Sequence, residues 1–280
     1  MYTKGVIALD IDGTVTARAH EIDPQVIDTL HQFAKEGWKI IFLTGRPLQW
    51  AEFPLRSLPF SYTIAVQNGA LLIEMPARTI VMRKYLTPEI LPQMRQISEL
   101  FETDFIIYSG SENNDWCYYC PISLPPPLLS YGLQRADFLG EKWQSLSNFS
   151  DLPVSCFTSV KFFTKNNQAF MLSQSIEKEL GLHAPPNRDP FDSNYYVVQA
   201  THAEANKGYI LKEFIRFMGI SGPVIAAGDD HNDYSLLKEA HIKIVMANAP
   251  PDLLAMADII APPATQNGII QGLREAMQRL

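Results

Sequence analysis

Two aspartates follow a short apolar run near the start of the chain. Residues 6–9 are continuously apolar and lead into Asp10 and Asp12, with Gly13 directly after them. In extended chain, residues two apart lie on one face, roughly 6–7 Å from each other, so the two carboxylates can flank a small tetrahedral group. Glycine lets the backbone turn sharply and come close to a ligand. A strand that simply ends in polar turn residues would share these features.

Three more polar clusters occur further along the chain. Residues 44–46 (Thr-Gly-Arg) follow an apolar run, and a hydroxyl with a backbone N–H at a helix start can bind an anion. Lys207 opens a helical pattern and can hold a phosphate as a point charge. Residues 228–233 follow another apolar run with acid and amide side chains, whose oxygens suit Mg²⁺. Taken alone, residues 44–46 are equally consistent with a helix cap, Lys207 is better explained as a solvated surface lysine, and residues 228–233 have an acidic helix cap as the alternative.

The elements around these clusters predict an α/β fold with a doubly wound parallel sheet. Strand-like runs at 6–9, 40–43 and 63–67 alternate with helical patterns, which favours parallel strands covered on both faces. Asp23 is a plausible N-cap for the first helix, and Gly37 can end it. The C-terminal part repeats the alternation, with expected strands at 223–227, 242–246 and 258–261 and helices at 207–218, 232–240, 251–257 and 269–280.

The middle of the chain differs from both ends in its residue composition and pattern. Runs rich in aromatic and β-branched residues predict strands at 105–108, 116–120, 160–164 and 195–199, with helices opening at 87 and spanning about 167–180. Three consecutive prolines at 125–127 are interpreted as a loop. We therefore expect a Rossmann-like core formed by residues 1–84 and 199–280, interrupted by an inserted α+β domain at 85–198.

In combination the four clusters indicate one site. Each lies at or near the end of a predicted strand, and open α/β sheets bind ligands at the carboxyl ends of their strands. Together they supply two carboxylates, a hydroxyl with a backbone donor, a lysine and an acidic metal site. Those groups can receive a phosphoryl group and neutralise its charge.

The four clusters, in this order, resemble the motifs of the haloacid dehalogenase-like phosphohydrolase superfamily. Asn68-Gly69-Ala70 and the stretch at 246–249 are similar to its Cof-type branch. In that branch a large α/β cap is inserted between the second and third motifs, which matches the interruption at 85–198. The resemblance implies a Mg²⁺-dependent phosphatase that acts on sugar phosphates or similar small phosphorylated metabolites.

The resemblance also implies roles for individual residues. Asp10 would attack phosphorus and become an aspartyl phosphate. Asp12 would protonate the leaving alcohol and then deprotonate the hydrolytic water. Thr44 and the Gly45 N–H would hold phosphate oxygens, and Lys207 would bridge the phosphate and Asp10.

For the metal, the resemblance implies that Asp10, the Asp12 carbonyl and Asp229 bind Mg²⁺, while Asp233 supports it through water. Asn232 would orient the phosphate region. Asp230 is expected to lie beside these residues without a role of its own. Two further residues are candidates for contact with substrate, Asn68 in the core and Lys161 on a strand of the insertion.

Composition excludes several other classes of protein. The 280 residues carry 23 basic and 30 acidic side chains, a net charge of −7, so nothing overall favours binding to nucleic acid or an anionic membrane. No apolar run approaches the roughly 18 residues of a membrane span. Three cysteines make no disulfide framework. In a strand, Cys117 and Cys120 would face opposite sides, which disfavours a metal site. We expect a cytoplasmic monomer or small homo-oligomer.

Three alternatives stay open. A phosphohexomutase of the phosphomannomutase type would share the core and the first chemical step. Only three arginines, Arg95, Arg135 and Arg188, lie within 87–198, which argues against a cap built to hold a bisphosphate. A non-catalytic phosphometabolite-binding regulator would not need the full set of acidic residues. A nucleotide-binding module would be expected to show a glycine-rich phosphate loop, and no such pattern is present.

Overall fold

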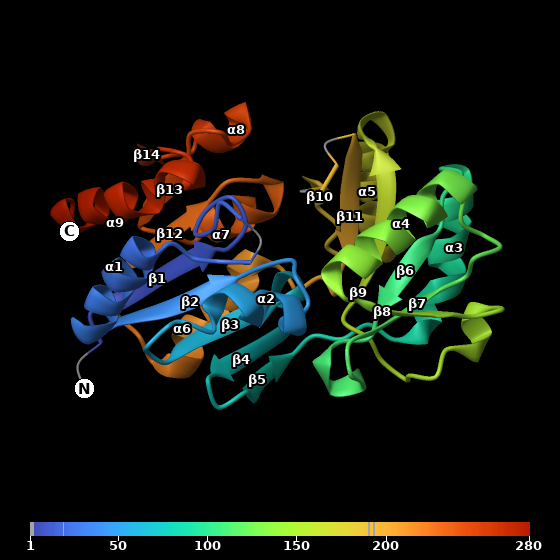
Figure 1. Ribbon diagram of the computed structural model, residues 1–280, viewed down its shortest axis with the longest axis horizontal. Coiled ribbons are helices and arrows are strands. Elements are labelled where there is room, and N and C mark those ends of the chain that lie inside the picture. The colour runs from blue at the N-terminus through green and yellow to red at the C-terminus, as the bar shows by residue number, and fades with distance from the viewer. Residues whose placement is uncertain (1–2, 19, 190, 193) are drawn as a thin grey trace. The chain divides into compact units, whose positions relative to one another are not determined.

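The computed structural model describes residues 3–18, 20–189, 191–192 and 194–280. The chain forms two compact units (Figure 1). The first comprises Met1–Arg46, Ala51–Arg83 and Asn206–Leu280, and the second comprises Pro47–Trp50 and Lys84–Ala205. The second unit thus interrupts the first in sequence and continues beyond residue 198, where the sequence places the end of the insertion.

An eight-stranded sheet forms the centre of the first unit, in the order β14-β13-β12-β1-β2-β3-β4-β5. From β14 to β3 all neighbours are parallel, which confirms the predicted fold class, while β4 and β5 add an antiparallel hairpin that sequence reasoning missed. The strands are β1 (Gly5–Asp10), β2 (Trp38–Leu43), β3 (Tyr62–Val66), β4 (Leu71–Met75), β5 (Thr79–Arg83), β12 (Val224–Gly228), β13 (Ile242–Met246) and β14 (Ile259–Ala261).

Helices cover both faces of this sheet. In Figure 1, α1 and α9 lie on one side and α6 and α7 on the other. Apolar residues of α6 and α7 pack with alternate residues of β1, β2 and β12 in one buried cluster, as expected for strands buried on both faces. The helices are α1 (Pro24–Lys35), α2 (Leu48–Leu55), α6 (Lys207–Met218), α7 (Tyr234–Lys238), α8 (Pro251–Leu254) and α9 (Gly268–Gln278).

Helix ends follow the local signals in the sequence. Asp23 accepts the N–H of Gln25 at the start of α1, and the predicted helix at 207–218 is α6 residue for residue. The expected helix at 232–240 is shorter and is preceded by a 3₁₀ turn, η5 (His231–Asp233). That turn arises because Asp230 and Asp233 cap it reciprocally.

A six-stranded mixed sheet forms the second unit, in the order β10-β11-β9-β6-β7-β8. Its strands are β6 (Phe105–Tyr108), β7 (Trp116–Tyr119), β8 (Lys142–Ser145), β9 (Ser159–Lys165), β10 (Pro186–Arg188) and β11 (Tyr195–Ala200), and its helices are α3 (Leu91–Leu100), α4 (Pro126–Leu139) and α5 (Asn166–Leu180). Apolar residues of α3 and α5 pack on one face of the sheet and those of α4 on the other.

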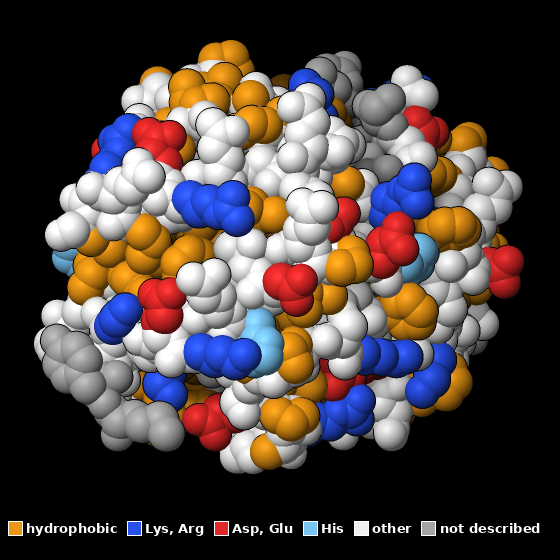
Figure 2. All heavy atoms as spheres, turned by 60° about the vertical axis from the view of Figure 1, so that its left-hand side comes forward, with side chains coloured by type: hydrophobic (Ala, Val, Ile, Leu, Met, Phe, Trp, Pro, Cys, Tyr) orange, Lys and Arg blue, Asp and Glu red, His pale blue; other side chains and the backbone are white. Residues whose placement is uncertain are grey.

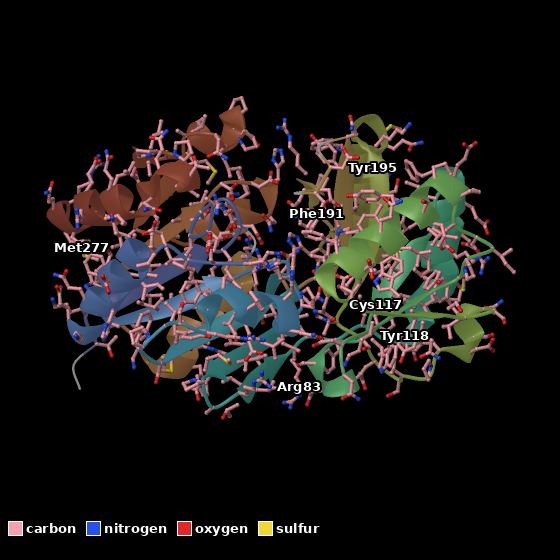
Figure 3. The ribbon with its side chains drawn as sticks, in the orientation of Figure 1. Arg83, Cys117, Tyr118, Phe191, Tyr195 and Met277 are labelled. Carbon is pink, nitrogen blue, oxygen red and sulfur yellow. The ribbon has the colours of Figure 1, made fainter. Side chains whose placement is uncertain are left out.

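The interpretation of residues 125–127 as a loop is wrong in part, because α4 begins at Pro126. Proline fits the first turn of a helix, where its missing N–H has no intrahelical partner in any case. Cys117, labelled in Figure 3, packs on the α4 side of the sheet, whereas Cys120 packs on the side of α3 and α5. The two thiols therefore face opposite sides, as expected.

Candidate active site

The site begins at the carboxyl end of β1. This strand is buried along its whole length and pairs with β12 on one side and β2 on the other. Asp10 is its last residue and lies opposite Leu43 of β2. Because the three strands are parallel, the residues that follow each of them reach one edge of the sheet. That edge carries Thr44 after β2 and Asp229 after β12.

Lys207 connects two of the predicted clusters. It is the first residue of α6, whose N-cap Asn206 accepts the N–H of Tyr209. Lys207 is fully buried, and its Nζ donates to Asp10 Oδ1 at 2.5 Å and to Asp233 Oδ1 at 2.6 Å. A buried ammonium needs such anionic partners, because burial otherwise penalises its charge. The two carboxylates outweigh burial and raise the pKa of Lys207, so the lysine is a cation.

Asp233 also organises the loop after β12. Its Oδ2 accepts the backbone N–H of Asp229 at 2.9 Å and that of Asp230 at 3.2 Å. A Cβ on Gly228 would lie 2.5 Å from the Cβ of Asp233, so only glycine allows this approach. Asp230, predicted as a neighbour, accepts the N–H of His231 and caps the 3₁₀ turn.

Three carboxylates meet beside the lysine. One oxygen from each of Asp10, Asp229 and Asp233 lies within 4.8 Å of the others. Asp10 Oδ2 is buried and has no hydrogen-bond partner among the residues that the structure describes. A single lysine leaves this cluster with excess negative charge, which a divalent cation with oxygen ligands relieves. The residues therefore fit a hard metal ion.

The excess charge also governs the pKa values of the carboxyl groups. Burial, assisted by Asp233 and Asp12 and opposed by Lys207, raises the pKa of Asp10 to about 8. Burial and the charges of Asp10 and Asp233 raise the pKa of Asp229 as well. Without a metal, the cluster relieves its repulsion by holding protons.

Gly13 and Thr14 hold the chain close to the carboxylate of Asp229. Gly13 has a φ of +80°, and a Cβ there would lie 2.1 Å from Asp229 Oδ2. Thr14 Oγ1 donates to Asp229 Oδ1 at 3.4 Å. The turn after β1 therefore packs directly against the loop after β12.

Asp12 has a partner that sequence reasoning did not foresee. The guanidinium of Arg46 donates from Nε to Asp12 Oδ2 at 2.6 Å and from Nη2 to Asp12 Oδ1. Arg46 is 4% exposed. Arg46 belongs to the Thr-Gly-Arg segment at 44–46, but no local pattern in the sequence pairs it with Asp12.

The remaining predicted phosphate contacts gather at the ends of β2 and β3. Thr44 is buried and donates its backbone N–H to Ala65 of β3. Asn68, in the 3₁₀ turn η1 (Gln67–Gly69), donates its backbone N–H to the Thr44 carbonyl at 2.8 Å. Asn232 Nδ2 donates to Asn68 Oδ1 at 3.3 Å, so the structure joins these two predicted residues.

Lys161 lies in the second unit, on β9. Its side chain is buried with Nζ 4.2 Å from the centroid of the Tyr108 ring, a cation–π distance. Burial, with a smaller contribution from Arg135, lowers the pKa of Lys161 to about 8. The lysine therefore lies largely buried against Tyr108.

Charges on the surface are mixed. On the face shown in Figure 2, lysine and arginine side chains are interspersed with acidic and apolar ones. Within the described ranges, no helix combines the length and the apolar character needed to cross a bilayer.

Comparison with known proteins assigns the family. Residues 7–273 match the model of the haloacid dehalogenase-like hydrolase family. The chain belongs to this family, and it is a phosphatase within it. The Bacillus subtilis (strain 168) protein YxeH, a phosphatase by name, is 25% identical over 276 residues, covering 96% of this chain and 97% of that protein.

Two other similarities extend over nearly the whole chain. The pyridoxal phosphate phosphatase YbhA of Escherichia coli (strain K12) is 24% identical over 284 residues, covering 96% of this chain and 97% of its own. A solved structure described as the subclass IIB sugar phosphatase BT4131 matches with a TM-score of 0.73 and 22% identity, covering 96% of this chain and 98% of the other. This structural match supports the fold, including the inserted mixed sheet.

Proposed function

We propose that this phosphatase hydrolyses small phosphomonoesters through a phosphate ester formed on Asp10, with Mg²⁺ as its cofactor. One observation carries the proposal. Asp10 lies at the end of the central strand with Oδ1 held by Lys207 and Oδ2 buried without a hydrogen-bond partner among the described residues. One oxygen is thus fixed, while the other remains for reaction or metal binding.

The first step transfers the phosphoryl group to the enzyme. An oxygen of the Asp10 carboxylate attacks phosphorus, and the bond from phosphorus to the alcohol oxygen breaks. Asp12 gives its proton to the departing alcohol. Lys207, which is cationic and already in contact with Asp10, reduces the repulsion between the two anions.

The second step restores the enzyme. Asp12, now a carboxylate, takes a proton from water, whose oxygen attacks phosphorus as the bond to Asp10 breaks. The products are inorganic phosphate, the Asp10 carboxylate and a protonated Asp12. The hydroxyl of Thr44, the N–H of Gly45 and the side chain of Asn232 hold the phosphate oxygens in both steps.

Asp10, the Asp12 carbonyl and Asp229 would hold Mg²⁺, and Asp233 would support it through water. When bound, it supplies positive charge against the phosphate and the carboxylates. The cluster of the three aspartates and the upward shift in the pKa values of Asp10 and Asp229 support this assignment.

We further propose that residues 85–198 act as a cap that selects the substrate, with Lys161 and Asn68 as candidate contacts. The named relatives include a phosphatase of pyridoxal phosphate and a sugar phosphatase. Small phosphorylated metabolites, sugar phosphates among them, are therefore the substrates to test first.

The test is phosphate release from a panel of hexose, pentose, triose and nucleotide monophosphates, each with Mg²⁺ and with EDTA. Asp10→Asn, which keeps the size of the side chain and removes the nucleophile, is the control. We expect release that requires Mg²⁺ and is lost in the variant. Release by Asp10→Asn at the rate of the unaltered protein would overturn the proposal.

A further inference from the structure

Arg46 is held in a fixed position behind Asp12. Its backbone N–H donates to Thr44 Oγ1 at 3.1 Å, and its carbonyl accepts the N–H of Gln67 at 3.0 Å. The backbone of Arg46 is thus tied to the ends of β2 and β3, while its side chain binds Asp12 after β1. The Arg46 side chain is 3% exposed, whereas the Asp12 side chain that it binds is 39% exposed.

The contact between Arg46 and Asp12 is bidentate. Nε meets one carboxylate oxygen of Asp12 and Nη2 meets the other. A guanidinium fork fixes the plane of a carboxylate as well as its position. Without the fork, an aspartate exposed to this degree has several staggered rotamers open to it.

We infer that Arg46 is a positioning residue for Asp12: it holds the carboxylate where it can exchange a proton with the substrate and with water. This inference rests on the role of Asp12 in the proposed function. Proton transfer requires hydrogen-bond reach, and a small misplacement of a catalytic group slows a reaction strongly. Arg46 should therefore affect the rate only by fixing the position of the Asp12 carboxylate.

The chemistry offers a way to isolate that effect. An alkyl phosphate releases an alkoxide, which needs a proton from Asp12 as the bond to phosphorus breaks. p-Nitrophenyl phosphate releases a stable phenolate and needs no proton. The value of kcat/KM reports the steps up to the first irreversible one, so with p-nitrophenyl phosphate it is insensitive to the position of Asp12.

The experiment compares kcat/KM for a simple alkyl phosphate and p-nitrophenyl phosphate in Arg46→Met. We expect a fall of about tenfold or more with the alkyl phosphate and less than about threefold with p-nitrophenyl phosphate. Arg46→Lys keeps the positive charge without the fork and should recover only part of the loss. In an Asp12→Asn background, Arg46→Met should cause no further loss with the alkyl phosphate.

Arg78→Met is the matched control. Arg78 forms a similar two-pronged contact with Glu52 in the same unit, away from the proposed machinery, and both kcat/KM values should stay unchanged. Thermal unfolding of each variant checks that it is folded, and Arg46→Lys carries the test if Arg46→Met is not.

Equal losses with both substrates in Arg46→Met or Arg46→Lys would show general damage to the site and overturn the inference. Unchanged values with the alkyl phosphate would overturn it too. Absence of activity in the unaltered protein would instead count against the proposed function, so the two failures are distinguishable.

Discussion

Replacing Lys207 tests how the site is held together. The side chain is fully buried and contacts carboxylate oxygens of Asp10 and Asp233 at 2.5 and 2.6 Å. Lys207→Met keeps an unbranched side chain but leaves these carboxylates buried without their cation. Breaking a buried ion pair on one side costs about 3–5 kcal/mol. We expect a loss of that size in the free energy of unfolding near pH 8 without metal.

The pH dependence of that loss follows from the same contacts. At about pH 5 the carboxyl groups whose pKa values are raised by burial can hold protons, so the repulsion left by the missing lysine is smaller. The loss should therefore shrink as the pH falls. Denaturant unfolding in EDTA at the two pH values measures it.

Lys4→Met is the control for removal of a lysine ion pair. Lys4 contacts Glu36 at 3.3 Å with side chains that are 47% and 38% exposed, and a surface pair of this kind contributes at most about 1 kcal/mol. The reasoning is refuted if Lys207→Met costs no more than Lys4→Met near pH 8. It is also refuted if the cost of Lys207→Met grows as the pH is lowered.

Two further predictions concern the carboxylate cluster. Since the folded-state pKa of Asp10 is raised from 3.8 to about 8, the folded protein binds more protons than the unfolded one in that window. The metal-free melting temperature should therefore fall as the pH rises, and Mg²⁺ should flatten the slope; a rise would contradict this. In Gly13→Ala, the new Cβ would lie 2.1 Å from Asp229 Oδ2. The variant should therefore bind Mg²⁺ at least about tenfold more weakly, which calorimetry measures. Gly140→Ala, with positive φ but open space, should bind Mg²⁺ normally.

Local patterns were sufficient to predict the central strands and the start of α6. Short apolar runs ending in polar residues predicted β1 and β2, and the helical pattern that Lys207 opens predicted α6. Since the carboxyl ends of parallel strands lie at one edge, the grouping of Asp10 with the loop after β12 followed from the topology.

Contacts between distant residues were not predictable in this way. Arg46 binds Asp12 from 34 positions away, and no local periodicity identifies the partner of a charged residue. Likewise, three prolines are typical of a loop. Proline also fits the first turn of a helix, and the apolar packing of Leu128 and Tyr131 against the second sheet favours α4 there. Tertiary packing outweighed local preference at that point.

The central claim is that a phosphate ester forms on Asp10. Asp12→Asn can accept a phosphoryl group from p-nitrophenyl phosphate but lacks the base for its hydrolysis, so the ester should accumulate. Reaction in the presence of Mg²⁺, acid quenching, reduction with borohydride and peptide mass spectrometry would locate it. We predict homoserine at position 10, the reduction product of an aspartyl phosphate. Turnover without modification, or modification at another residue, would contradict the claim.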